Sequence, residues 1–143
     1  MSASVRYRKP DELRGLGKRH AIVEASAGTG KTYILEHLVV DLLLGAEVPL
    51  EQILVVTFTE KATAELIQRV RGKIRQLLTL RPDDPAAVEA EGLPDDACWI
   101  IDDRAREILR RALTNFDRAT IATIHGFCQR LLSEHAFLQQ RLF

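Results

Sequence analysis

Apolar residues along this chain fall into two alternating patterns, short continuous runs and longer stretches with helical spacing. The short runs predict buried strands at residues 20–24, 53–58 and 119–124. The longer stretches place apolar residues three or four positions apart and predict helices at residues 30–44, 60–80, 98–113 and 125–138. The resulting order, β-α-β-α-α-β-α, predicts an α/β fold with a parallel sheet and flanking helices.

The segments between these elements are polar or rich in turn residues. Residues 1–19 are basic and predict an extended or weakly helical lead-in, and residues 81–97 are rich in Pro, Asp, Glu and Gly and predict an exposed loop. Trp99 is expected to pack on the buried side of the helix at 98–113. We therefore divide the chain into a lead-in at 1–19 and a domain at 20–143.

The junction between the first strand and the first helix carries the first candidate chemistry. Residues 25–32 read Ala-Ser-Ala-Gly-Thr-Gly-Lys-Thr, a phosphate-binding loop with Ala at its first position in place of Gly. Gly28 and Gly30 allow backbone conformations in which N–H groups converge on a polyphosphate at a helix N-terminus. In such a loop Lys31 reaches the β- and γ-phosphates and the Thr32 hydroxyl binds Mg²⁺.

Composition and cysteine usage narrow the class of protein. With 46% hydrophobic and 28% charged residues and a formal net charge of zero, the chain has the composition of a soluble globular domain. It has no run of about 20 apolar residues for a membrane helix and no apolar core of a secretory signal near its N-terminus. Cys98 and Cys128 form neither a disulfide framework nor a metal pattern, which favours the reducing cytoplasm.

The zero net charge conceals a strong segregation. Residues 61–81 carry six basic side chains against one acid, residues 82–103 carry eight acids and no base, and residues 104–118 carry five arginines against two acids. A basic face is the electrostatic footprint of a nucleic-acid site, although solvated helices often carry such residues as well.

Two further motifs follow predicted strands. After the strand at 53–58, Thr57 and Thr59 are candidates to hold phosphate oxygens, and Phe58 offers a ring face to an unpaired base. The alternative is that Thr59 caps the next helix and Phe58 belongs to the core. After the strand at 119–124, His125 and Phe127 are placed to stack on or hydrogen-bond a nucleotide, unless they are structural. Gly126 between them leaves room for another backbone segment to approach.

Taken in order, three stretches closely resemble motifs of the RecB-type branch of the UvrD-like superfamily 1 DNA helicases. Residues 24–32 resemble helicase motif I, residues 57–66 resemble motif Ia, and residues 123–130 resemble motif Ib. The resemblance implies catalytic roles for Lys31 and Thr32, with Thr32 on the metal. It implies ATP contacts from Ala25, Ser26, Ala27, Gly28, Thr29, Gly30, Lys31 and Thr32. It implies DNA contacts from Thr57, Phe58, Thr59, Lys61, His125 and Phe127.

The family implies a fold, an activity and partners. The fold is a RecA-like P-loop NTPase domain, here an incomplete one corresponding to the front half of the first motor domain. The activity is ATP- and Mg²⁺-dependent translocation on single-stranded DNA with duplex unwinding, in recombination and double-strand break repair. The partners are DNA and RecC- and RecD-like subunits of an exodeoxyribonuclease V.

These 143 residues lack the family's acidic motif, Asp-Glu-x-x-Asp, since Asp102 and Asp103 precede a strand and continue into a helix. We therefore expect little or no ATPase activity from this chain by itself. Two alternatives remain: a non-hydrolysing nucleotide- or DNA-binding module, and a small P-loop phosphotransferase with an arginine lid at residues 104–111.

Overall fold

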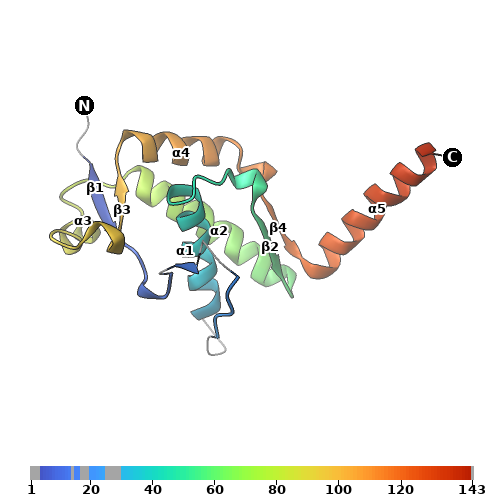
Figure 1. Cartoon of the computed structure of the whole chain (residues 1–143), viewed down its shortest axis with the longest axis horizontal. Helices are drawn as coiled ribbons and strands as arrows, with labels where there is room; N and C mark the ends of the chain where they lie inside the picture. Colours follow the sequence, from blue (N-terminus) through green and yellow to red (C-terminus); the bar gives the residue numbers. More distant parts are fainter. Residues whose placement is uncertain (1–3, 14, 17–19, 25–29, 143) are drawn as a thin grey trace.

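The computed structural model describes residues 4–13, 15, 16, 20–24 and 30–142, the last six of these by their backbone alone. Short strands and helices follow one another along the chain, in the order β1-α1-β2-α2-α3-β3-α4-β4-α5 (Figure 1). The helices are α1 (Gly30–Leu44), α2 (Glu60–Leu78), α3 (Pro85–Glu89), α4 (Asp103–Thr114) and α5 (Ile124–Leu142). The strands are β1 (Val5–Arg8), β2 (Leu54–Thr57), β3 (Cys98–Ile101) and β4 (Thr120–Thr123). Short 3₁₀ turns are η1 (Asp11–Leu13), η3 (Leu50–Gln52), η4 (Asp95–Ala97) and η5 (Phe116–Arg118).

The described strands form two separate pairs. β2 and β4 are parallel, in a register that sets Leu54 opposite Thr120 and Thr57 opposite Thr123. β1 and β3 are antiparallel, with Val5 opposite Ile101. The predicted α/β class with a parallel strand pair and flanking helices is thus confirmed, while the antiparallel pair was not expected.

Two predicted elements are wrong. Residues 20–24 form no strand, because none of them pairs with a described strand and the side chain of Ile22 is 93% exposed. The predicted helix at 98–113 begins only at Asp103, because the apolar run before it is β3. The Asp102 carboxylate accepts a hydrogen bond from the backbone N–H of Ala105 at 2.8 Å and so sets the start of α4.

The lead-in and the predicted loop at 81–97 are both more ordered than expected. The lead-in supplies β1, and residues 81–97 supply α3 and η4. Ala87 and Ala90 are buried, and the Arg6 guanidinium on β1 donates to the carbonyl oxygen of Leu93 at 2.9 Å. The stretch 81–97 therefore packs onto β1, and its description as an exposed loop is wrong in part.

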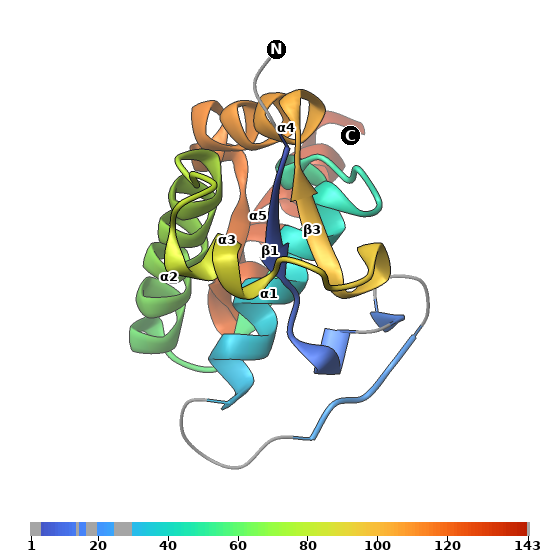
Figure 2. The same cartoon turned by 90° about the vertical axis from the view of Figure 1, so that its left-hand side faces the viewer.

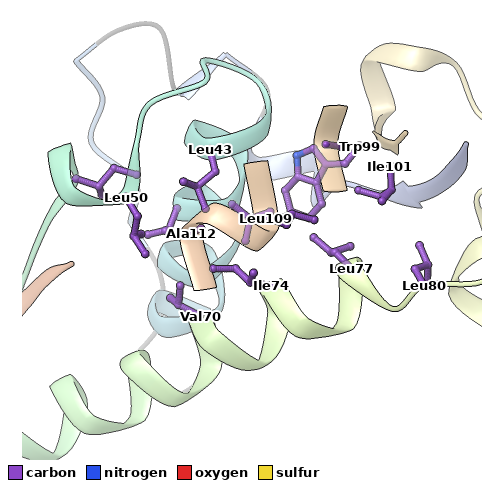
Figure 3. Packing of buried hydrophobic residues seen from close by; sticks show 14 of the residues in the cluster. Leu43, Leu50, Val70, Ile74, Leu77, Leu80, Trp99, Ile101, Leu109 and Ala112 are labelled. Atoms are coloured by element: carbon purple, nitrogen blue, oxygen red, sulfur yellow. The ribbon is translucent and has the colours of Figure 1, made fainter. Parts of the chain in front are cut away.

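The core lies between α1, α2 and α4 and is closed at one end by the antiparallel pair (Figure 2). Figure 3 shows Leu109 and Ala112 of α4 pointing toward the α2 side chains Val70, Ile74 and Leu77. The buried positions of α2 recur every three or four residues, as its sequence predicted. Trp99 is buried as expected, but from β3.

Helix α5 leaves this body and points away from it (Figure 1). Its side chains from Cys128 to His135 are exposed, including Leu131 and Leu132. No helix among the described residues is both long enough and apolar enough to span a membrane.

Candidate functional site

The first turn of α1 contains the part of the predicted phosphate loop that the structure describes. Residues 25–29 lie outside the described residues, whereas Gly30, Lys31 and Thr32 open α1. The Lys31 side chain is exposed, and the Thr32 side chain is half-buried. A helix N-terminus presents N–H groups without intrahelical partners and a partial positive charge, both of which favour a phosphate.

The segment after β2 is fixed by threonine hydroxyls. The Thr63 and Thr57 hydroxyl oxygens are 2.5 Å apart, and the Thr57 hydroxyl also donates to the carbonyl oxygen of Thr59 at 3.2 Å. The Thr59 hydroxyl caps α2 by accepting from the N–H of Ala62 at 3.0 Å. The capping role considered for Thr59 is therefore confirmed, and Thr57 serves the same turn.

Phe58, between these two threonines, is not a core residue. Its side chain is 90% exposed, although full burial of a phenylalanine ring is worth about 1.5–3 kcal/mol. Nothing in the packing of the described residues accounts for an apolar ring held in water at this turn. Lys61, the second residue of α2, is also exposed.

The segment after β4 is built in a similar way. The Thr123 hydroxyl is buried and accepts a hydrogen bond from the N–H of Gly126 at 3.0 Å, which starts α5. A Cβ at Gly126 would lie 3.0 Å from that hydroxyl oxygen, so the glycine accommodates a side chain rather than the backbone segment that we expected. His125 is exposed and Phe127 is half-buried.

The two motifs meet at one edge of the parallel pair. Because Thr57 lies opposite Thr123, the segments that carry Phe58 and His125 leave adjacent strands at their carboxyl ends. Ligands of α/β sheets bind at that edge. The N-terminal ends of α1 and α2 both lie toward the lower end of the molecule in Figures 1 and 2. The predicted DNA-contacting residues are thus grouped, whereas residues 25–29 are not described.

An aromatic stack behind the first turn of α1 was not predicted from the sequence. The ring centroids of Tyr33 and His37 are 4.2 Å apart. The His37 ring is in turn stacked on Trp99, with 6.0 Å between their centroids. The Trp99 indole N–H in turn donates to the Asp41 carboxylate at 2.9 Å. Burial raises the pKa of Tyr33 and lowers the pKa of His37. The i, i+4 spacing of Tyr33 and His37 was the available signal.

The described residues contain no group of three or more His, Cys, Asp or Glu side chains that would hold a metal ion by themselves. A Mg²⁺ ion needs no such group when nucleotide phosphates and water supply most of its ligands. The Thr32 hydroxyl in the first turn of α1 is compatible with that role.

Comparison with known proteins identifies the class. The family model of the UvrD/REP helicase N-terminal domain matches residues 12–142, and the chain belongs to this family. The resemblance inferred from the three motifs is thereby confirmed. Membership in this family also removes the phosphotransferase alternative.

Individual relatives are consistent with the RecB-type branch. The chain is 42% identical over 147 residues to the RecBCD enzyme subunit RecB of Escherichia coli, covering 93% of this chain and 12% of that protein. It is 44% identical over 117 residues to the RecB subunit of Mycobacterium tuberculosis, covering 78% and 10%. It is 37% identical over 132 residues to an ATP-dependent helicase/nuclease protein of Moorella thermoacetica, covering 90% and 8%. The chain therefore spans about a tenth of the length of these relatives.

Proposed function

We propose that this chain is the ATP-binding and DNA-contacting part of an ATP-dependent DNA helicase that translocates on single-stranded DNA and unwinds duplex during recombination and double-strand break repair. Its fold would be the front half of a RecA-like P-loop motor domain, residues 20–143. One observation carries the proposal. Thr57 and Thr123 are paired at the ends of adjacent parallel strands, so the segments with Phe58 and His125 leave the same edge, and the Phe58 ring is 90% exposed there. Family membership and the relatives' names support it.

The nucleotide would lie at the start of α1. Residues 25–32 would surround its phosphates with backbone N–H groups, and Lys31 would place its ammonium against the β- and γ-phosphates. Thr32 would hold Mg²⁺, which neutralises phosphate charge. The chain itself supplies no acidic Asp-Glu-x-x-Asp motif for activating water, so hydrolysis by these residues alone is predicted to be weak or absent.

Single-stranded DNA would cross the carboxyl edge of β2 and β4. Phe58 would stack on a base, and Phe127 or His125 would contact a neighbouring nucleotide. The N–H groups of Glu60 and Lys61 precede the first capped N–H of α2 and are suited to a backbone phosphate. Thr57 and Thr59 would act by holding this turn in shape. RecC- and RecD-like subunits are proposed partners of the whole protein.

Substitution of Phe58 tests the DNA contact. Phe58→Ala should weaken binding of the 143-residue chain to a fluorescent oligo-dT by about 5- to 150-fold, since stacking of one base on an aromatic ring is worth about 1–3 kcal/mol. The melting temperature should not change, because the ring is exposed. The matched control is Leu132→Ala, which also removes an exposed apolar side chain, but from α5, away from the proposed DNA edge. Equal affinity of the Phe58→Ala and Leu132→Ala chains would contradict the proposal.

Substitution of Lys31 tests the nucleotide site. Lys31→Ala should abolish binding of a fluorescent ATP analogue by this chain, and hydrolysis by the intact parent protein, because the phosphates lose their cation. Binding of oligo-dT without nucleotide should remain, since Lys31 is not part of the proposed DNA edge. A variant that loses both kinds of binding to the same extent would be evidence against the assigned role.

A further inference from the structure

The outward face of α2 carries a row of polar and basic side chains that begins at the proposed DNA edge. Lys61, Gln68 and Arg75 follow one another at intervals of seven residues, which places them on one line along the helix. All three are exposed, and Arg71 lies beside this line, half-buried. We call these four residues the α2 ridge. The buried positions of α2 lie on the opposite side of the helix.

The cations of the α2 ridge have no acidic partners among the described residues. No described carboxylate lies within ion-pair distance of Lys61, Arg71 or Arg75, whereas Arg69 on another flank pairs with Glu65 at 3.0 Å. A solvated helix usually balances its charges with pairs three or four residues apart, as Arg69 does. The ridge therefore presents uncompensated positive charge.

Arg71 is held in place by an aromatic ring. Its guanidinium carbon lies 4.6 Å from the centroid of the Phe116 ring, and Phe116 is buried just after α4. Stacking on a ring face orients a guanidinium and leaves its N–H edge available to an anion. An arginine positioned in this way loses little side-chain entropy when it binds a phosphate.

Acids on α2 itself are few, because the helix carries only Glu60 and Glu65, and Glu65 pairs with Arg69. The acidic stretch 82–97 forms α3 and η4 beside β1, where Asp95 pairs with Arg6. The stretch starts beyond the C-terminal end of α2, far along the helix from Lys61 but near Arg75 in its last turn, and none of its described carboxylates forms an ion pair with Arg75. A polyanion that reaches the edge at Phe58 would consequently meet positive charge along the outward face of α2.

We propose that the α2 ridge continues the single-stranded DNA path from Phe58 and binds successive backbone phosphates through Lys61, Arg71 and Arg75, with Gln68 as a neutral donor. This inference rests on the proposed function. A helical rise of 1.5 Å over the 14 residues from Lys61 to Arg75 gives about 21 Å. At 3.4 Å per phosphate of a stacked strand, this length spans about six nucleotides beyond the ring.

The salt dependence of oligo-dT binding by the 143-residue chain tests the ridge. Each phosphate contact contributes about 0.7 to the slope of log K against log salt for a single strand, so Arg71→Gln/Arg75→Gln should lower the slope by about 1.4. The affinity of the variant for a 16-mer, relative to that of the wild type, should therefore be about 25-fold lower at 0.1 M salt than at 1 M salt. A 4-mer, which is too short to reach from Phe58 to Arg75, should show a smaller loss.

The matched control removes two arginines that face away from the α2 ridge. Arg104 and Arg111 are exposed on α4 and line the groove against residues 47–51, so Arg104→Gln/Arg111→Gln should leave the slope unchanged. Arg75→Gln alone keeps the stacking of Arg71 on Phe116 and should lower the slope by about 0.7, which covers the case in which the double variant fails to fold.

The outcomes separate this inference from the proposed function. If Phe58→Ala weakens binding while Arg71→Gln/Arg75→Gln has the same slope and affinity as the α4 control, the ridge proposal is overturned and the proposed function stands. If the wild-type chain does not bind oligo-dT at all, both are overturned. Equal losses for the 4-mer and the 16-mer would show that the arginines act as general charge, and this outcome would also overturn the proposed path.

Discussion

His37 should make the stability of this domain fall at mildly acidic pH. Its imidazole is 3% exposed, its Nδ1–H donates to the carbonyl oxygen of Tyr33 at 2.7 Å, and its ring is stacked on Trp99. Burial lowers the pKa of His37 below its ordinary value of 6.5, because the interior solvates the imidazolium poorly. Desolvation is the largest cause; the hydrogen bond to the Tyr33 carbonyl and the charges of Glu36 and Glu12 oppose this shift, and Lys73 adds to it.

The sign and size of the effect follow from proton binding. Below pH 6.5 the unfolded chain protonates at His37 while the folded chain resists, so stability is retained above that pH and is lost as the pH falls. One proton corresponds to about 1.4 kcal/mol per pH unit. With an unfolded pKa of 6.5, the loss from His37 between about pH 7.5 and about pH 5.5 is therefore at most about 1.4 kcal/mol.

Urea denaturation of wild type and His37→Gln at these two pH values measures the effect. The free energy of unfolding of the wild type should fall by more than that of the variant, by up to about 1.4 kcal/mol. His125→Gln, which removes an exposed histidine, should behave like the wild type. Identical losses in the wild type and His37→Gln would refute the reasoning.

Two further substitutions test the core. Leu109→Ala should lower the free energy of unfolding by about 2–5 kcal/mol, because Leu109 is 0% exposed and its truncation leaves a cavity, whereas Leu132→Ala should change it by less than about 0.5 kcal/mol. Trp99→Phe removes the N–H that donates to Asp41, whose side chain is 16% exposed, and should cost about 1–3 kcal/mol. Urea titration followed by circular dichroism measures both, and wild-type stability of either core variant would contradict this description of the packing.

The elements that the sequence predicted well are those whose signals are local. α1 occupies residues 30–44 as expected, since its apolar spacing and Gly45 just after its end specify its length. Its buried face was not predicted, because this face includes Glu36 and His37. α2 begins where Thr59 can cap it. The parallel strands were found because each is an apolar run beside a helix with a clear stripe.

The elements that failed depend on distant partners. Residues 98–101 are as apolar as a helix segment, and only their pairing with β1, at least 90 residues away, makes them a strand. Apolar runs this short do not distinguish the two structures by periodicity. Residues 20–24 were predicted as a strand but form none, because an apolar run becomes a strand only where another strand supplies hydrogen bonds. The packing of α3 onto β1 likewise depended on a strand that was not predicted.

The candidate site follows the same division. Residue types in sequence order were sufficient to nominate Phe58 and His125, but their meeting at one edge required the register of β2 against β4. That edge is held by Thr57, Thr59 and Thr123, which cap or brace the following helices. Phe58, between the first two, therefore has no role in packing. Changes at the threonines should therefore disturb stability and DNA binding together, whereas changes at Phe58 should alter binding alone. Loss of DNA binding without loss of stability at Phe58 would identify a binding surface, whereas no loss of either would indicate an ordinary exposed turn. Stability should be unaffected because the ring is 90% exposed.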